Sequence, residues 1–301
     1  MTEGFKSGFI AVAGRTNVGK STLLNALVGQ KVSIVSDRPQ TTRNVIRLIR
    51  TTDASQMVFL DTPGFHKAKN KLGQYMTDSA GESLSQVDLI LFLVEEDIAI
   101  GPGDRRLIDT LSEQSVPVIL VINKIDKLPR EETLKKIDMY KDFGFINEIV
   151  PVSAYKGVNI DTLVKVIEQY LPEGPMFFPE DMLTDRAERF IVGEIVRENM
   201  LRFVKEEIPH GTAVEITSMK ERNSAFTDIE ATIFCEKKSH KGIIIGKDGA
   251  MLKKIASSAR RDMENLLGCG VNLSVWVKVL DDWRDKPMSL KEFGYIKEKD
   301  I

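Results

Sequence analysis

The sequence predicts a doubly wound α/β domain followed by a smaller α+β domain. Over the first 170 residues, apolar strand-like runs alternate with helical patterns, which is typical of a parallel sheet covered by helices. The segment Leu171–Pro179 then holds three prolines and a glycine, a composition that breaks both kinds of regular structure. Beyond this segment the pattern changes to a helix, two strands, two helices and a last strand, which is an α+β order.

The expected elements follow the hydrophobic pattern along the chain. In the first domain they are the strand Phe9–Ala13, a helix Ser21–Leu27, the strands Met57–Leu60, Leu89–Val94, Val118–Ile122 and Ile149–Val152, and a helix Ile160–Tyr170. In the second domain they are a helix Arg186–Glu206, the strands Ala213–Met219 and Asp228–Phe234, helices on both sides of Gly246–Gly249, and the strand Val271–Val279. We expect the domains to cover residues 1–172 and 186–301, with residues 173–185 as a linker.

The composition is that of a water-soluble folded protein. Of the 301 residues, 42% are hydrophobic and 29% are charged, and the longest apolar runs are too short to span a bilayer. Residues 1–13 lack the pattern of a secretory signal, so we expect a cytoplasmic location. The two cysteines, Cys235 and Cys269, show no paired spacing and are expected to be reduced thiols.

The charge of the chain is locally uneven. The formal net charge is −2, which by itself argues against a nucleic-acid partner. Yet the segment Lys237–Arg261 contains eight basic residues and one acidic residue, Asp248, which gives 8 − 1 = +7. This basic segment therefore faces an anionic partner or water.

A phosphate-binding motif follows the first strand. The run Gly14-Arg15-Thr16-Asn17-Val18-Gly19-Lys20-Ser21 is a complete G-x-x-x-x-G-K-S, placed between a strand and a helix as this motif requires. Its backbone N–H groups wrap the phosphates at a helix N-terminus, Lys20 supplies a positive charge, and Ser21 is a ligand for Mg²⁺. We expect this loop, with Thr22, to bind the phosphates of a nucleotide.

Two further segments complete the expected magnesium site. In Asp61-Thr62-Pro63-Gly64, Asp61 ends an apolar strand and is expected to hold Mg²⁺, while the N–H of Gly64 contacts the terminal phosphate. Gln40-Thr41-Thr42-Arg43 is a polar segment in which a threonine can complete the metal shell only while the third phosphate is present. Thr42 is the first choice for that threonine and Thr41 is the second.

The run Asn123-Lys124-Ile125-Asp126 predicts which base is bound. The Asp126 carboxylate can accept hydrogen bonds from guanine N1–H and the 2-amino group, a pair of donors that adenine lacks. The Lys124 stem can lie on the base, and Asn123 is expected to tie this loop to the phosphate-binding loop. Ser153-Ala154, at the end of the next strand, offers a backbone N–H to guanine O6. By these motifs, residues 8–172 resemble the translation-factor-related P-loop GTPases.

The second domain carries a G-x-x-G loop. Gly246-Lys247-Asp248-Gly249 lies between two helices, after two strands and before a third, and in this position it resembles the loop of a type II KH domain, of order αββααβ. Such a loop clamps the backbone of about four nucleotides of single-stranded RNA. The expected RNA-binding residues are Lys241, Gly242, Ile243, Ile244, Ile245, Gly246, Lys247, Asp248, Gly249 and Lys253.

A P-loop GTPase domain followed by this KH domain resembles the bacterial Era family over essentially the whole chain. The resemblance implies a GTP switch that captures the single-stranded 3′ end of the small-subunit (16S) rRNA through its KH domain, in assembly of the 30S subunit. Members are also described as peripherally associated with the inner face of the cell membrane, which nothing in the composition shows. We expect a monomer that uses Mg²⁺ and GTP or GDP.

Three positions bear on how closely the resemblance holds. Phe65 stands where Ras-like GTPases have a water-orienting glutamine, so we expect slow intrinsic hydrolysis, on the order of 10⁻⁴ to 10⁻³ s⁻¹. Asn17 resembles the asparagine that helps to hold K⁺ in potassium-stimulated members, and the alternative is that it only shapes the loop. Thr16 replaces a common proline and affects no chemistry.

Three other functions compete with this interpretation. The first is a P-loop ATP enzyme or kinase, which would need a base site without the Asn123–Asp126 run. The second is a membrane-associated signalling GTPase whose basic segment binds anionic lipid. The third is a passive RNA-binding module with a vestigial nucleotide site.

Overall fold

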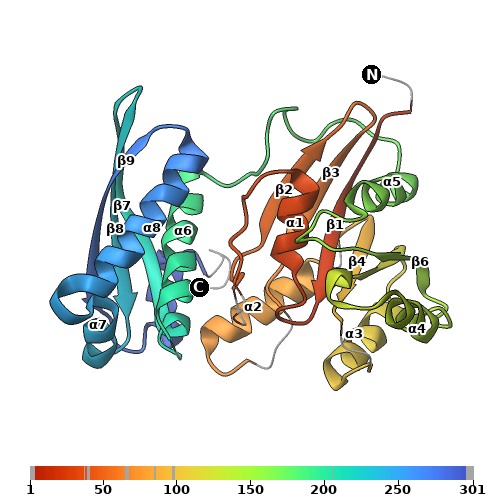
Figure 1. The fold of residues 1–301 in the computed structure, drawn as a ribbon, viewed down its shortest axis with the longest axis horizontal. Helices are drawn as coiled ribbons and strands as arrows, with labels where there is room; N and C mark the ends of the chain where they lie inside the picture. Colours follow the sequence, from red (N-terminus) through yellow and green to blue (C-terminus); the bar gives the residue numbers. More distant parts are fainter. Residues whose placement is uncertain are drawn as a thin grey trace. The chain divides into compact units, whose positions relative to one another are not determined.

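The structure, a computed structural model, describes residues 4–36, 38, 41–64, 68–84, 86–96, 99–205 and 207–295. The chain forms two compact units, each with its own sheet (Figure 1). The first unit comprises Met1–Ser33, Thr42–Lys67 and Met76–Asp185, and the second comprises Ile34–Thr41, Ala68–Tyr75 and Arg186–Ile301.

The first unit contains a six-stranded, mostly parallel sheet. Its strands are β1 (Lys6–Gly14), β2 (Ile46–Thr51), β3 (Ser55–Asp61), β4 (Leu89–Val94), β5 (Val118–Ile122) and β6 (Ile146–Pro151), in the order β2-β3-β1-β4-β5-β6. Only β2 runs antiparallel to its neighbour. From β1 the chain adds β3 on one side of the sheet and then β4, β5 and β6 on the other side. This reversal of strand order is the doubly wound arrangement, so the predicted fold class is confirmed.

Helices cover both faces of this sheet. They are α1 (Lys20–Val28), α3 (Pro102–Ser112), α4 (Arg130–Tyr140) and α5 (Ile160–Tyr170), while α2 (Lys71–Glu82) is divided between the two units after Tyr75. On one face Ala11 and Ala13 of β1 pack with Leu107 of α3 and Tyr140 of α4. Because successive strand residues point to opposite faces, their buried neighbours face α1 and α5, which lie side by side in front of the sheet in Figure 1.

The strand directions decide where the polar motifs lie. The carboxyl ends of parallel β1, β3, β4, β5 and β6 fall on one edge of the sheet. The loops that leave this edge begin at or just after Gly14, Asp61, Val94, Ile122 and Pro151. In α/β sheets this edge is the one that binds ligands.

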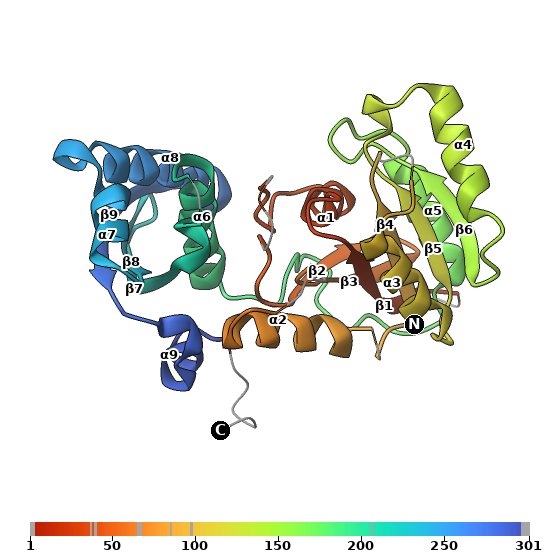
Figure 2. The ribbon, with the colours of Figure 1, turned by 90° about the horizontal axis from the view of Figure 1, so that it is seen from below.

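The second unit has the predicted αββααβ order. Its elements are α6 (Glu188–Phe203), β7 (Thr212–Asn223), β8 (Phe226–Cys235), α7 (Lys238–Ile245), α8 (Ala250–Leu267) and β9 (Gly270–Val279), and the sheet order is β7-β8-β9. β8 is antiparallel to β7 and parallel to β9. Helices α6 and α8 pack side by side against the sheet, as Figures 1 and 2 both show.

A short helix that the sequence pattern did not predict, α9 (Pro287–Glu292), follows this core. The fully buried ring of Trp283 lies just before it and donates a hydrogen bond from Nε1 to Gly211 O at 2.9 Å. Phe293 packs edge-on against Trp283 and also contacts Phe234 of β8. The C-terminal part of the described chain is therefore part of the second unit's core.

The segment expected to be a linker, residues 173–185, belongs to the first unit. Gln56 of β3 is fully buried and holds it, since its Oε1 accepts hydrogen bonds from the N–H groups of Phe177 and Phe178 at 2.7 and 3.0 Å. Its Nε2 donates to Phe178 O at 2.9 Å. Farther along, Ile49 N–H of β2 donates to Leu183 O at 2.9 Å. The segment is thus an ordered strap that is bonded first to β3 and then, at its end, to the edge strand β2.

Membrane-spanning helices and disulfides can be checked across the described part of the chain. None of its helices has the length and apolarity needed to cross a membrane. Both cysteines are free thiols, as predicted, with Cys235 buried and Cys269 half-buried.

We predict that Gln56→Ala lowers the free energy of unfolding of the first unit by about 2 kcal/mol. The change leaves two backbone N–H groups of the strap without their acceptor, and each unsatisfied buried group costs on the order of 1–3 kcal/mol. Urea titration followed by far-ultraviolet circular dichroism measures it. Both tryptophans, Trp276 and Trp283, lie in the second unit, so their fluorescence transition should stay unchanged. Gln169→Ala, at an exposed position, is the matched control, and an equal loss in both variants would contradict the role of Gln56.

Candidate functional site

The phosphate-binding loop connects β1 to α1. Two of its residues, Asn17 and Gly19, have left-handed backbone conformations, with φ of 68° and 96°. A Cβ at Gly19 would lie 2.4 Å from Nδ2 of Asn123, so this position admits only glycine. The close approach joins the loop after β1 to the loop after β5.

Lys20 lies at the start of α1, where its side chain is almost fully buried under the loop. Its Nζ donates hydrogen bonds to the carbonyl oxygens of Gly14 at 3.1 Å and Arg15 at 2.8 Å. Burial lowers the pKa of Lys20 to about 8, although the negative charge of Asp61 opposes this shift. The ammonium group is therefore held inside the loop at a site where anionic phosphates would relieve the cost of its burial.

Three oxygen-bearing side chains converge beside Lys20. Ser21 Oγ lies 3.1 Å from Thr42 Oγ1 and 3.1 Å from Asp61 Oδ2, and Thr42 Oγ1 lies 3.4 Å from the same carboxylate oxygen. Asp61 is fully buried, and its Oδ1 has no hydrogen-bond partner among the described residues. Burial raises the pKa of Asp61, against the hydrogen bonds it accepts and the charge of Lys20.

This oxygen cluster fits Mg²⁺. Hard divalent cations bind carboxylate and hydroxyl oxygens, and a buried carboxylate with an unused oxygen gains from a cation beside it. Thr42, the first choice from the sequence, lies in the cluster. Thr41 does not, because its Oγ1 donates to Arg38 O at 2.7 Å. Gln40 lies outside the described residues.

Gly64 lies close to the phosphate-binding loop. A Cβ at this position would lie 2.8 Å from Thr16 Cγ2 and 3.2 Å from Lys20 Nζ, so the backbone of Gly64 reaches the loop only because it has no side chain. Thr62 turns the chain inward by donating from Oγ1 to Val12 O at 3.0 Å. Pro63 connects Thr62 to Gly64. Phe65, which follows Gly64, lies outside the described residues.

The buried amide of Asn123 joins three loops. Its Nδ2 donates to Val18 O at 2.9 Å, and its Oδ1 accepts from Ala154 N–H at 3.1 Å. The tie to the phosphate-binding loop is the contact that the sequence analysis expected. Because Ala154 belongs to the loop after β6, the expected base-contacting loops lie together.

Asp126 is held at the same place. Its Oδ1 accepts a hydrogen bond from Ser153 Oγ at 2.5 Å, and Ser153 Oγ also accepts from Lys156 N–H at 3.2 Å. The carboxylate is therefore oriented before any base arrives. Lys124 adopts a left-handed backbone conformation, with φ of 63°.

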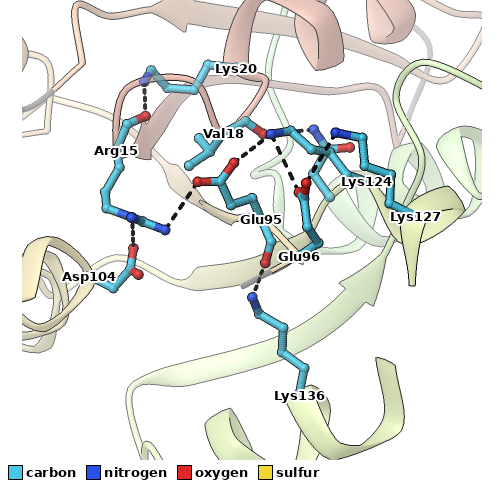
Figure 3. Close-up of polar contacts among 10 residues, drawn as sticks. Arg15, Val18, Lys20, Glu95, Glu96, Asp104, Lys124, Lys127 and Lys136 are labelled. Atoms are coloured by element: carbon cyan, nitrogen blue, oxygen red, sulfur yellow. Dashed lines mark hydrogen bonds and ion pairs between the residues drawn. The ribbon is translucent and has the colours of Figure 1, made fainter. Parts of the chain in front are cut away.

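A charged cluster that the sequence analysis did not predict surrounds this loop (Figure 3). Glu95 and Glu96, which follow β4, bind the cations of Arg15, Lys124 and Lys127. Burial lowers the pKa of Lys124, but the carboxylates of Glu95 and Glu96 outweigh it, and the pKa is raised. The position of Glu95 and Glu96 at the carboxyl end of a parallel strand was the available signal for these residues.

The G-x-x-G loop of the second unit lies between α7 and α8. Gly246, Asp248 and Gly249 all have positive φ, of 76°, 50° and 76°. The side chains of Lys247 and Asp248 are exposed there. Of the other expected RNA-binding residues, Gly242, Ile243 and Lys253 are exposed, and Lys241 and Ile245 are half-buried. Both glycines thus form a tight turn with an accessible backbone.

One of the expected RNA contacts is wrong. The side chain of Ile244 is fully buried in the core of the second unit, whereas that of Ile243 is half exposed. Consecutive residues on a helix point in directions about 100° apart, so the three isoleucines of α7 cannot all face one groove. The apolar surface beside the loop therefore comes from Ile243 and Ile245.

The fold and these sites define a class of protein. The first unit, with its phosphate-binding loop between β1 and α1, is a P-loop GTPase domain, and the second, with its αββααβ order and G-x-x-G loop, is a KH domain. Family models agree with this division. One described as a 50S ribosome-binding GTPase matches residues 9–124, and one described as a KH domain matches residues 207–284.

Relatives match almost the whole chain. The GTPase Era of Clostridioides difficile strain 630 is 54% identical over 293 residues, which is 97% of this chain and 99% of that protein. The GTPase Era of Alkaliphilus metalliredigens strain QYMF is 53% identical over 292 residues, 97% and 99% of the two chains. The chain belongs to the Era family of GTPases.

Solved structures agree. A crystal structure of Era in complex with MgGDPNP and nucleotides 1506–1542 of 16S ribosomal RNA matches with a TM-score of 0.93 and 42% identity, over 97% of this chain and 100% of that one. A tyrosine-to-alanine variant of Aquifex aeolicus Era bound to GDP and AlF₄⁻ matches with the same TM-score of 0.93, identity of 42% and coverage.

We predict that nucleotide binding takes up a proton at Lys20 when the pH is above about 8. The free protein loses the Lys20 proton near that pH, whereas phosphates bind the charged form, so GDP affinity should fall about threefold from about pH 7.5 to 8.5. Calorimetry in two buffers of different ionisation enthalpy counts the protons.

The arginine of a Lys20→Arg variant cannot lose its proton in this range, so the variant is the control and should take up none. The folded-state pKa lies below the ordinary 10.5, so stability of the free protein should rise between about pH 8 and 10.5 as the buried charge is lost. A proton count that is the same at about pH 7 and 8.5 in the unmodified protein would contradict the assignment.

Proposed function

We propose that this GTPase binds the single-stranded 3′ end of 16S rRNA through its KH domain, under control of the bound nucleotide, and acts in assembly of the 30S subunit. The observation that carries the proposal is the exposed G-x-x-G turn of the second unit, set in a segment of charge +7. The Era structure that holds 16S ribosomal RNA supports it.

Two comparisons bear on which ribosomal subunit the protein acts on. The GTPase family model names the 50S subunit but matches only residues 9–124. The solved Era complex contains 16S RNA, which belongs to the small subunit, and resembles this chain over 97% of its length. The second comparison includes the RNA-binding unit, so we favour the small subunit.

We propose domain limits of 1–172 and 186–301. The change of compact unit after Asp185 supports the second limit. Residues 173–185, expected from the sequence to be a linker, we propose to assign to the GTPase domain, which their hydrogen bonds to β2 and β3 support.

The nucleotide site is proposed on the geometry above. Lys20, Thr42 and Gly64 would carry catalysis, with Ser21, Thr42 and Asp61 as the ligands of Mg²⁺, which supplies positive charge to the phosphates when bound. The nucleotide-binding residues would be Gly14, Arg15, Thr16, Asn17, Val18, Gly19, Lys20, Ser21, Thr22, Asp61, Thr62, Pro63, Gly64, Asn123, Lys124, Asp126, Ser153 and Ala154. Pre-oriented backbone donors and a fixed ammonium group stabilise the charge that develops during phosphoryl transfer.

Some properties rest on the sequence and the family resemblance. Slow intrinsic hydrolysis rests on Phe65, and a K⁺ site rests on Asn17. The φ of 68° at Asn17 supports the alternative that this residue shapes the loop, since asparagine tolerates the left-handed region. We also propose that the protein is a cytoplasmic monomer that associates peripherally with the membrane.

We predict that Asp126→Asn exchanges the base preference from guanine to xanthine. The carboxylate accepts both guanine donors, whereas an amide can donate to the oxygen at the 2-position of xanthine. Ser153 Oγ can still donate to the amide oxygen, so the loop should keep its shape. GTP affinity should fall at least about a hundredfold, as expected for lost charged hydrogen bonds, and affinity for xanthosine triphosphate should rise. Titration with both nucleotides measures this.

Asp161→Asn is the matched control for this test. It makes the same chemical change at an exposed position in the first turn of α5, and it should leave both affinities unchanged. Equal GTP affinity in Asp126→Asn and the unmodified protein would show that Asp126 does not read the base.

We predict that Gly249→Asp abolishes binding to the 3′ end of 16S rRNA while GTP affinity stays unchanged. Gly249 is the better position for this test, because a Cβ at Gly246 would lie 2.7 Å from Met251 Cβ and disturb the fold. Space around Gly249 is open, and its φ of 76° suits Asp and Asn. A carboxylate where a phosphate approaches should lower affinity more than tenfold by charge repulsion.

Gly249→Asn has nearly the same shape without the charge and should lose less. Fluorescence anisotropy with a single-stranded RNA of this sequence, at one fixed salt concentration, measures both variants. Retained RNA affinity in folded Gly249→Asp would overturn the proposal. Loss of binding to anionic vesicles, with RNA binding unchanged, would favour a lipid partner for the basic segment.

A further inference from the structure

Glu95 contacts two separate loops of the nucleotide site. Its Oε1 accepts from Arg15 Nη2 at 3.3 Å, and its Oε2 accepts from Lys124 Nζ at 2.5 Å (Figure 3). Its carbonyl oxygen accepts a hydrogen bond from Lys136 of α4, so the backbone is held independently of the side chain. One carboxylate thus joins the phosphate-binding loop to the base-recognition loop.

The Arg15 side of this cluster is rigid. Arg15 Nε donates to Asp104 Oδ1 at 2.9 Å, and the Asp104 side chain is almost fully buried. A Cβ at Gly103 would lie 2.7 Å from Arg15 Cδ, so the arginine stem packs directly on the backbone of α3. Glu95 therefore binds a guanidinium whose own position is fixed.

The Lys124 side of this cluster is the flexible one. A lysine stem has many rotamers and loses conformational entropy when it is confined to one path. An anchor for the Lys124 ammonium beyond the edge of a purine ring lowers the entropic cost of laying the stem along that ring. Glu95 holds it at 2.5 Å and Glu96 contacts it at 3.5 Å, while Glu96 also binds the exposed Lys127.

We propose that Glu95 is a positioning residue for guanine-nucleotide binding. Its carboxylate anchors the Lys124 ammonium, so that the lysine stem is directed along the base, and through Arg15 it ties that anchor to the phosphate-binding loop. The inference rests on the proposed contact between Lys124 and the base. Glu95 acts through these two cations and is not a catalytic residue.

An ordinary exposed ion pair would behave differently. Exposed pairs contribute little and tolerate the loss of one partner. The side chains of Arg15, Lys124 and Glu95 are 28%, 24% and 17% exposed, and the three form a connected network with Asp104. Connected, partly buried charges are coupled, so deletion of the central carboxylate removes the main anchor of Lys124 and its link to Arg15, which Asp104 continues to hold.

The test measures dissociation of a fluorescent GDP by stopped flow in the full-length protein. Glu95→Gln keeps the shape and removes the charge, and it should accelerate dissociation about three- to tenfold, the range for losing a partly exposed charged contact. Lys124→Met keeps an apolar stem and removes the ammonium, and it should accelerate dissociation to a similar extent. In the double variant the two effects should not add, because Glu95 acts through that ammonium.

Further readouts separate positioning from a loss of structure. Single-turnover hydrolysis of bound GTP should be unchanged in Glu95→Gln, whereas the KM for GTP should rise. Dissociation from the unmodified protein should accelerate with salt, and this dependence should flatten in Glu95→Gln. Glu96→Gln, whose closer partner is the exposed Lys127, is the matched control and should change dissociation less than about twofold.

The outcomes distinguish the inference from the proposed function beneath it. Unchanged dissociation in Lys124→Met would overturn the contact between Lys124 and the base. The proposal requires faster dissociation in Glu95→Gln. A Glu95→Gln protein that releases GDP at the unmodified rate or more slowly would therefore overturn the role of Glu95. Fully additive effects in the double variant would overturn it as well. If Glu95→Gln fails to fold, Glu95→Asp, which shortens the anchor, should accelerate dissociation in the same direction.

Discussion

The nucleotide site depends on the buried amide of Asn123. It is the point where the loops after β1, β5 and β6 are bonded to one another, through Val18 O and Ala154 N–H. Gly19 has no side chain because that amide occupies the space where a Cβ would lie. A parallel sheet brings these loops to one edge, but it does not fix the distance between them. The amide does, and the phosphate and base sites are consequently held in one geometry.

Much of this arrangement was predictable because the sequence encodes it locally. Buried strands such as Leu89–Val94 read as apolar runs, and the polar residues after them had to meet at the carboxyl edge of the sheet. β2 was not predicted, since Arg47 and Arg50 interrupt its apolar pattern at an edge. Glu95 was not predicted either, because its proposed role depends on Arg15 and Lys124, which lie far from it in the sequence. The wrong expectation for Ile244 came from treating adjacent helix residues as one surface.

The strap shows a different limit of sequence reasoning. Its prolines correctly exclude a helix or an inner strand, but they do not exclude an extended segment bonded to a sheet edge. Leu48 and Thr184 form an isolated antiparallel bridge, and Arg47 pairs with Asp185 at 2.8 Å. An open edge strand is a site for unwanted pairing, and residues 183–185, after the prolines, cover part of the edge strand β2. Gln56, a polar residue in the buried strand β3, fixes the start of the strap through its three hydrogen bonds to Phe177 and Phe178.

The phosphate and magnesium sites hold opposite charges that are both costly to bury. Burial lowers the pKa of Lys20 to about 8 and raises that of Asp61, so each group is driven toward its neutral form. Their mutual attraction offsets only part of this cost. In the proposed site, a bound phosphate chain and Mg²⁺ would supply the missing opposite charges. The free energy of nucleotide binding would then include relief of the electrostatic cost of burying Lys20 and Asp61, which is how a rigid, preorganised loop can gain affinity without moving.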